Sequence, residues 1–414
     1  MNTENSPMTN DRVQRLRAVE ALRAGVPNRD VARFFPPHQS DVEARWGEAL
    51  EKAGAGQSAP GLLLEGDFGT GKSHWLERLE HLALEEGWVC STVVLNKETP
   101  LYDANKLLRA AAQSALVGGR SGPALSEIAH SYSAESAPGY QELFDWVHGP
   151  ERDPRLALSL WLFERTPDPE VRERVITEWM GAPMLVGEMK LALREAGQTS
   201  PLIPKPRRDN GLENWEFMAR FFRSAGYGGW AVLLDETEMI SKYSVRQRGR
   251  SYAHLVQLLG AAKTGVPGLV CAATITKDYA GQVLHGRKND AVQIPLKMEN
   301  TRDDHLSAPA LAGMRAIEKS GLDLRPPTRA QVDELFEQTR VFYGQAYDWE
   351  APNLENRREY SGSTSLREHL RWWINAWDLL RLYDYQSDTI VETLEFSYQE
   401  DADLQRDENA KIVL

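Results

Sequence analysis

The 414-residue sequence has little cysteine and no long apolar run. Its two cysteines, Cys90 and Cys271, lie far apart in apolar segments and form no CxxC pair, which argues against a cysteine-based zinc or redox site. No stretch approaches the roughly 20 apolar residues that a membrane-spanning helix needs. The polar residues 1–10 contain no apolar core like that of a signal peptide. These absences predict a cytoplasmic protein with reduced thiols in its core.

The sequence also lacks an excess of basic residues. The net charge is -12, which argues against strong non-specific attraction to nucleic acid. The charge is uneven, because residues 384–414 contain nine acidic residues and two basic ones. We interpret this acidic C-terminal tail as a solvated end of the chain, with a docking segment as the alternative. The composition, with 42% hydrophobic and 26% charged residues, is that of a globular protein with a sizeable core.

Helical and strand-like segments alternate through the middle of the sequence. Short apolar runs predict strands, and the segments between them have the spacing of amphipathic helices. This alternation predicts an α/β fold of the P-loop NTPase type, in which helices cover both faces of a parallel sheet. The five predicted strands cover residues 61–64, 88–95, 230–234, 269–273 and 291–295.

The chain is long enough for one large domain with appended modules. Residues 1–55 are expected to form an N-terminal helical module, and residues 56–300 the core. The long separation of the second and third predicted strands requires a large insertion, which we expect to be helical over about 100–225. Residues 301–383 are expected to form a helical lid, followed by the acidic tail.

The clearest chemical signal is GDFGTGKS at residues 66–73, which matches GxxxxGK[ST] between an apolar strand and an amphipathic helix. Glycines let such a loop curl so that its backbone N–H groups face phosphate oxygens, and the helix N-terminus adds partial positive charge. We expect Lys72 to contact the β and γ phosphates of ATP and Ser73 to supply a hydroxyl to Mg²⁺. The expected nucleotide-binding residues are Gly66, Asp67, Phe68, Gly69, Thr70, Gly71, Lys72, Ser73 and His74.

A second apolar run, WAVLL at 230–234, ends in the two carboxylates Asp235 and Glu236. With a P-loop upstream, this pattern is typical of a Walker B element. We expect Asp235 to hold Mg²⁺ and Glu236 to polarise the attacking water. Because small-molecule kinases transfer phosphate to a bound acceptor, they need no base dedicated to water. The adjacent glutamate therefore favours hydrolysis over kinase chemistry.

Weaker candidates come from the fourth predicted strand and the lid. Thr274 and Thr276 would lie beside the carboxylates and orient the water if the third and fourth strands are neighbours. Threonine is also simply a common strand residue. Arg367 begins a lid helix, where its guanidinium suits contact with the γ phosphate. An ordinary surface arginine is the alternative.

An arginine supplied to the site of a neighbouring subunit is also expected for some ATPases of this kind. Arg287, just before the fifth predicted strand, is the first choice, and Arg246, Arg248 and Arg250 follow it. The last three belong to the segment 241–250, which contains four basic residues. A nucleic-acid contact and a solvated loop are equal alternatives for that segment.

Together these motifs resemble the initiator-like branch of the AAA+ and STAND P-loop ATPases. The shared features are GDFGTGKS, LLDETE, a fourth strand ending in threonine and a helical lid with an early arginine. The resemblance implies ATP binding at Lys72 and Ser73, hydrolysis through Asp235 and Glu236, and nucleotide sensing by Arg367.

Four longer segments resemble the ATP-binding-domain family of BREX phage-defence systems, and KETPLYD at residues 97–103 points to it most narrowly. This resemblance implies a bacterial defence role beside other defence-system proteins. Related ATPases often carry a winged-helix DNA-binding domain where this sequence has its acidic tail, which is too short for one. The four segments are ALRAGVPNRDVARFF, GLLLEGDFGTGKSHWLERLEHLALEEGW, NKETPLYDANKLLRAA and STSLREHLRWW.

The combined prediction is an ATP-hydrolysing switch or loader that uses ATP and Mg²⁺. One alternative is a DNA-stimulated translocase, which needs a ring and a basic channel. Another is a scaffold that holds ATP with little turnover. Other defence proteins are expected as partners, a membrane is not, and DNA binding and a nucleotide-dependent homo-oligomer are left open.

Overall fold

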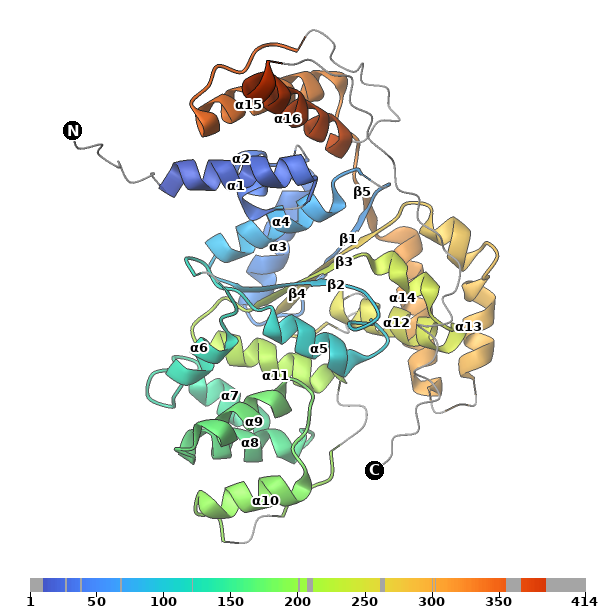
Figure 1. Ribbon diagram of the computed structural model, residues 1–414. Coiled ribbons are helices and arrows are strands. Elements are labelled where there is room, and N and C mark those ends of the chain that lie inside the picture. The colour runs from blue at the N-terminus through green and yellow to red at the C-terminus, as the bar shows by residue number, and fades with distance from the viewer. Residues whose placement is uncertain are drawn as a thin grey trace, which may run out of the picture.

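A five-stranded parallel sheet lies at the centre of the molecule, with helices on both of its faces (Figure 1). Its strand order is β2-β3-β4-β1-β5, so the α/β prediction is confirmed. The strands are β1 (Leu62–Glu65), β2 (Val89–Val94), β3 (Trp230–Asp235), β4 (Leu269–Ile275) and β5 (Gly321–Asp323). The computed structural model describes residues 10–26, 28–37, 39–67, 69–120, 122–199, 202–206, 211–260, 265–299, 301, 303–354 and 366–384.

Successive side chains of β3 pack into different cores, as the two-residue period of a strand requires. Ala231 and Leu233 belong to one hydrophobic cluster, and Val232 and Leu234 belong to another. Helices therefore cover both faces. The first face carries α3 (Ser40–Gly54) and α4 (Lys72–Glu85), and the second carries α5 (Ala104–Gln113), α11 (Gly211–Ser224) and α12 (Val245–Leu258).

The prediction of a strand at residues 291–295 is wrong. These residues lie in α13 (Asp290–Met298), and the fifth strand of the sheet is β5. Ile294 and Met298 are fully buried, whereas Val292 is 51% exposed. Burial at four-residue spacing is the pattern of a helix. An apolar run of five residues fits a strand or a buried helix turn equally well, so the sequence alone did not decide between them.

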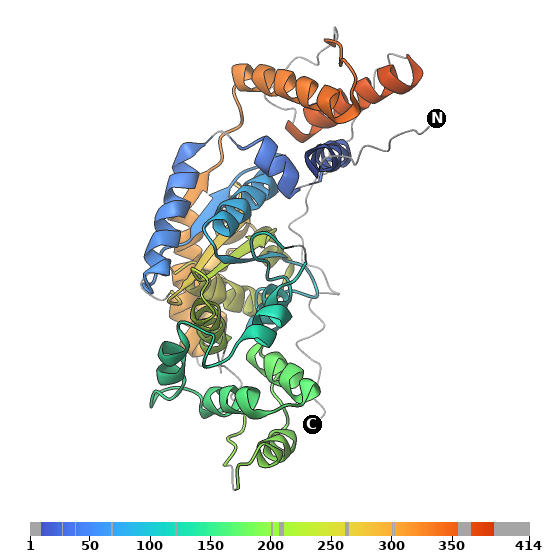
Figure 2. The same ribbon diagram turned by 90° about the vertical axis from the view of Figure 1, so that its left-hand side faces the viewer.

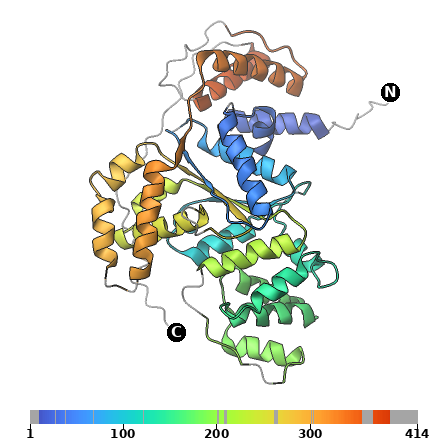
Figure 3. The ribbon, with the colours of Figure 1, turned by 180° about the vertical axis from the view of Figure 1, so that it is seen from behind.

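The insertion between β2 and β3 is helical and extends away from the sheet (Figure 1). Two of its helices begin with a proline in the first turn after an aspartate cap, at Asp153 and Asp168, which is the arrangement that proline favours. From behind, the insertion and the group of α12, α13 and α14 (Ser307–Lys319) lie apart (Figure 3). After α5, the insertion contains α6 (Leu125–Ser131), α7 (Tyr140–Val147), α8 (Pro154–Arg165), α9 (Pro169–Trp179), α10 (Val186–Glu195) and α11.

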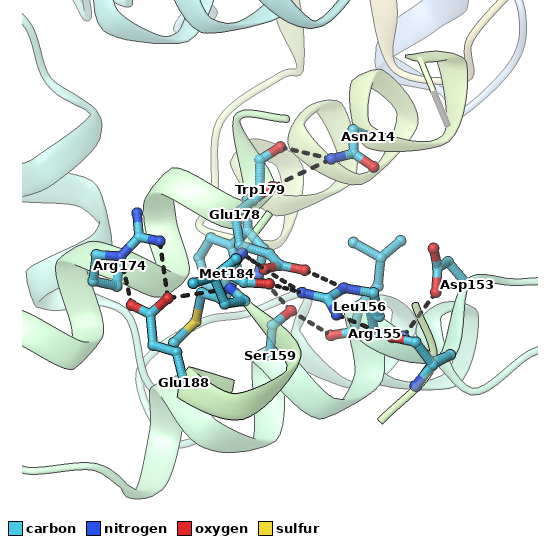
Figure 4. Close-up of polar contacts among 12 residues, drawn as sticks. Asp153, Arg155, Leu156, Ser159, Arg174, Glu178, Trp179, Met184, Glu188 and Asn214 are labelled. Atoms are coloured by element: carbon cyan, nitrogen blue, oxygen red, sulfur yellow. Dashed lines mark hydrogen bonds and ion pairs between the residues drawn. The ribbon is translucent and has the colours of Figure 1, made fainter. Parts of the chain in front are cut away.

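A buried ion pair joins α8 to α9 in the insertion (Figure 4). The Arg155 guanidinium donates to both Glu178 carboxylate oxygens at 2.7 and 2.8 Å, and also to the backbone carbonyls of Met184 and Pro204. The Met184 N–H donates to Glu178, and Asn214 donates to the Glu178 carbonyl. These contacts connect α8, α9, α11 and the segments between them into one unit.

The lid, which we define as α15 (Arg329–Tyr347) and α16 (Leu366–Tyr383), packs on the N-terminal helices α1 (Asn10–Ala24) and α2 (Arg29–Phe34) (Figure 2). These four helices share one hydrophobic cluster, to which no strand contributes among the described residues. By contrast, α3 packs on the core, where the Trp46 ring N–H donates to the Leu79 carbonyl at 3.0 Å. The N-terminal residues are therefore divided between the lid and the core.

The segment expected to be lid, residues 301–383, also contains core elements. Helix α14 packs on α12, and β5 pairs with β1. Of the acidic tail, only Asp384 falls within the described residues. Among the helices that the structure describes, none has the length and apolar character needed to cross a bilayer.

Candidate functional site

The P-loop connects β1 to α4 at the carboxyl end of the sheet. Gly69 and Gly71 have φ values of 82° and 93°, a left-handed conformation that favours glycine. The Lys72 side chain is buried, and its ammonium donates to the Gly66 and Asp67 carbonyls at 2.9 and 3.3 Å. The loop therefore holds a positive charge at its inner side, as the motif predicts. Phe68 lies outside the described residues.

Asp235, at the end of β3, accepts three hydrogen bonds. Ser73 of α4 donates to Oδ2 at 2.6 Å, Thr274 of β4 donates to Oδ1 at 2.6 Å, and the Glu236 N–H donates to Oδ1 at 2.9 Å. Strands β3 and β4 are neighbours, so their carboxyl ends bring these groups together. The Ser73 hydroxyl and the Asp235 carboxylate are hard oxygen ligands that suit Mg²⁺.

Thr274 is fully buried and bonds Asp235 and the Glu236 N–H. Its position beside the carboxylates matches the expectation from strand order. The contacts it makes fix the orientation of Asp235, which is a different task from the expected one of orienting water. Thr276 is also buried, with an exposure of 2%.

Glu236 follows Asp235 in a left-handed conformation, with φ 60° and ψ 41°. This conformation is uncommon for a residue other than glycine, and strained backbone positions cluster at functional sites. Partial burial raises the pKa of the Glu236 carboxyl, and the nearby Asp235 charge acts in the same direction against the Lys72 ammonium. The residue itself is exposed, so its carboxyl has access to water.

A cavity of about 520 Å³ lies between the P-loop, the helices α1 and α2, and the lid. Gly69, Thr70, Gly71 and His74 line its P-loop end, and Arg367 lines it from the lid. The structure thus brings Arg367 near the P-loop, although it lies 296 residues after Gly71 in the sequence (367 − 71). The apolar part of the wall includes Leu22, Val31, Phe35, Pro326, Pro327, Leu335, Leu366 and Leu370.

His74 connects the P-loop helix to the wall of this cavity. One of its ring nitrogens, Nε2, lies 2.7 Å from the Phe35 carbonyl, and burial lowers the pKa of the ring. A neutral ring with its proton on Nε2 donates this bond. His74 therefore joins α4 to the end of α2.

The other arginine candidates lie away from the cavity. Arg287 is exposed ahead of α13 and does not line the cavity. Arg246 and Arg250 both pair with Asp303. Arg248 is buried and pairs with Asp290 at 2.7 Å. The segment that looked like a basic loop is thus mostly the start of α12, with its arginines bound to carboxylates.

Sequence reasoning missed Glu238, a third carboxyl near the P-loop lysine. It is buried, with an exposure of 2%, although it lies only three residues after Asp235. The second glutamate of DETE was the available signal. The walls that α1 and α2 contribute to the cavity were also missed, because their contact with the lid is not visible in a local pattern.

A family model described as "BREX system ATP-binding protein BrxC/D" matches residues 11–135 and 205–348, which is more than half of the chain. The matched segments contain the P-loop, Asp235, Glu236 and Thr274. Most of the insertion and Arg367 lie outside them. No curated protein matches the chain.

Proposed function

The chain belongs to the BREX system ATP-binding protein family BrxC/D, and from that premise we propose that it hydrolyses the ATP it binds and acts as a nucleotide-driven switch or loader in phage defence. The P-loop residues Gly66–Ser73 would receive the phosphates. In this proposal Lys72 supplies positive charge, Asp235 and Ser73 hold Mg²⁺, and Glu236 is the general base.

The observation that carries the proposal is the arrangement around Asp235. Its carboxylate is fixed by Ser73, Thr274 and the Glu236 N–H at distances of 2.6 to 2.9 Å. Bound Mg²⁺ would neutralise phosphate charge at the Ser73 and Asp235 oxygens. The Glu236 carboxylate is then the adjacent group that has access to water and can accept its proton.

The cavity supports the switch part of the proposal. Its apolar wall suits a nucleoside, and its phosphate end is the P-loop. The wall is contributed partly by the core and partly by the cluster that joins α1 and α2 to the lid. A ligand in this cavity contacts both units, so a nucleotide that binds one arrangement better would shift the equilibrium between them.

The main rival is a DNA translocase. Such a motor needs a basic channel, and three of the four basic residues in segment 241–250 instead pair with Asp290 and Asp303. This pairing favours the switch. A scaffold with little turnover is less consistent with a complete set of Lys72, Asp235 and Glu236.

Calorimetry and phosphate release test these possibilities in the full chain. We expect Mg²⁺-dependent ATP binding, slow hydrolysis and no large acceleration by duplex DNA. Asp235→Asn should lose the Mg²⁺-dependent part of the affinity, while Glu236→Gln should bind ATP within a few-fold of the parent. Equal losses in the two variants would contradict the assigned roles. Strong DNA stimulation would favour the motor, and binding without phosphate release would favour the scaffold.

A further inference from the structure

Glu238 is a buried ionisable group near the P-loop that the proposed mechanism does not use. It lies in η1 (Thr237–Lys242), which directly follows Asp235 and Glu236. One carboxyl oxygen, Oε2, is inaccessible to solvent and has no hydrogen-bond partner. An unbonded carboxyl oxygen in a protein interior is costly and rare, so its presence requires an explanation.

The Lys72 ammonium provides the opposing charge. Burial lowers the pKa of Lys72, and nearby negative charges raise it. Of these charges Glu238 has the largest effect, and Asp235 has the next largest. Reciprocally, Lys72 is the main group that favours the ionised form of Glu238. The Lys72 ammonium therefore bonds to the carbonyls of its own loop and also interacts electrostatically with the Glu238 carboxyl.

The other groups that face Glu238 disfavour its negative charge. Burial raises the pKa of Glu238 to about 7, and the Asp235 and Glu236 charges act in the same direction. Tyr279, which follows β4 and is fully buried, also faces Glu238, whose charge contributes to raising the Tyr279 pKa. A phosphate group near Lys72 would add further negative charge around the Glu238 carboxyl.

We propose that Glu238 is a positioning residue for Lys72. The Glu238 carboxylate competes with the ATP phosphates for the Lys72 ammonium, and protonation of the carboxylate ends this competition. The inference rests on the proposed function, because it requires ATP at the P-loop. It assigns to Glu238, the second glutamate of DETE, a control over affinity that is distinct from magnesium binding and water activation.

The sign of the effect follows from this competition. Above pH 7 the Glu238 carboxyl is ionised and repels the phosphates, so binding is accompanied by proton uptake. Below pH 7 it is already neutral and the repulsion is absent. Because one pKa unit corresponds to a factor of ten in affinity, a charge-free substitute should bind Mg·ATP about fivefold to tenfold more tightly than the parent at pH 8 and about equally at pH 6.

The experiment is calorimetric titration of the full chain with Mg·ATP at pH 6, 7 and 8, for the parent, Glu238→Gln and Glu65→Gln. Glu65 is a matched control, because it directly precedes the P-loop but faces Asp323 and Lys277. Titration of the phosphates of ATP affects all three proteins equally, so the differences between them isolate the side chains. Repeating the titrations in buffers of different ionisation enthalpy measures the proton uptake.

We expect Glu238→Gln to remove the proton uptake and to bind more tightly at pH 8 only, with Glu65→Gln like the parent. Equal affinities and equal proton uptake in the parent and Glu238→Gln would overturn the inference and leave the proposed function intact. Tightening by Glu65→Gln to the same degree would also overturn it, as a general charge effect. Failure of the parent to bind ATP would overturn the proposed function, and this inference with it.

Discussion

Two regions of this chain bury opposite charges, and they treat them differently. In the insertion, Arg155 and Glu178 form a double hydrogen bond, and nearby backbone groups bond them further. Beside the P-loop, Lys72 and Glu238 are similarly buried, but one oxygen of Glu238 has no partner. Burial is common to both regions, and hydrogen-bond satisfaction distinguishes them.

This difference in hydrogen bonding distinguishes charges that stabilise the fold from charges that serve the site. A fully bonded ion pair has one good arrangement and fixes the helices that carry it. Beside the P-loop, one oxygen of Glu238 has no hydrogen-bond partner, so the charges there are not fixed in the same way. We therefore expect substitutions in the insertion to change stability, and substitutions in the site to change nucleotide handling with little effect on stability.

The largest expected effect is the loss of the insertion pair. Glu178→Gln leaves the buried Arg155 charge uncompensated, and breaking such a pair typically costs about 3–5 kcal/mol. Urea unfolding measures this loss in the free energy of unfolding, and hydrogen exchange in α8 and α9 measures it locally. ATP affinity should stay within a few-fold of the parent under conditions in which the chain is folded.

An exposed ion pair in the same region is the control. Arg174 and Glu188 are also joined by two hydrogen bonds, but their side chains are 42% and 35% exposed (Figure 4). Because exposed pairs contribute about 1 kcal/mol or less, Arg174→Ala should be mild. Equal destabilisation by Glu178→Gln and Arg174→Ala would remove the distinction between the two kinds of pair.

In the site, the largest expected effect belongs to Glu236. Glu236→Gln should slow single-turnover hydrolysis by about 10²-fold or more, since general-base assistance is typically worth 10² to 10⁴. Its unfolding free energy should match that of the parent, because the residue is exposed. The variant should also accumulate the ATP-bound form. Hydrolysis at the parental rate would show that another group activates the water.

The pH dependence of hydrolysis sharpens the same assignment. Glu236 acts as a base only when ionised, and its pKa is raised by burial and by Asp235. The rate should therefore fall as the pH decreases, with its midpoint above the value of about 4.3 for an unperturbed glutamate. A pre-steady-state rate profile of the parent measures this midpoint. A rate that stays constant through the acid range would contradict a carboxylate base.

A smaller effect is expected from the lid. Arg367→Ala removes the cationic side chain that reaches the cavity from α16, and one lost charge-assisted hydrogen bond corresponds to about tenfold in the lifetime of the ATP-bound form. The lifetime is best measured in the Glu236→Gln background, where hydrolysis does not limit it. Arg329→Ala is the control, because Arg329 is an exposed lid residue that does not line the cavity. Identical lifetimes in the two double variants would remove Arg367 from the sensing role.

Sequence reasoning was most successful where a local pattern carries the geometry. The P-loop and the Asp235–Glu236 pair each depend on a few adjacent residues after an apolar run, and their meeting follows from the rule that parallel strands end at one edge. The same rule brought Thr274 beside Asp235. The first four strands were also predicted near their observed positions.

Sequence reasoning failed where contacts between residues far apart in the sequence determine the structure. Arg248 looked like part of a basic loop, but Asp290, 42 residues later, holds it in the interior. Glu238 is buried and interacts electrostatically with Lys72 and Tyr279, which are distant in sequence, so its sequence neighbours do not reveal this setting. The docking of α1 and α2 on the lid likewise joins opposite ends of the chain.

Thermal unfolding of the parent and of Lys72→Ala, each with and without Mg·ATP, tests most directly the claim that the P-loop charge serves the nucleotide and not the fold. Without nucleotide, the two proteins should unfold at the same temperature. With ATP at 100 times its dissociation constant, the parent should gain about 2.7 kcal/mol of stability, and Lys72→Ala should gain almost none. An equal ATP-induced gain in Lys72→Ala, or a marked loss of its stability without nucleotide, would contradict the account.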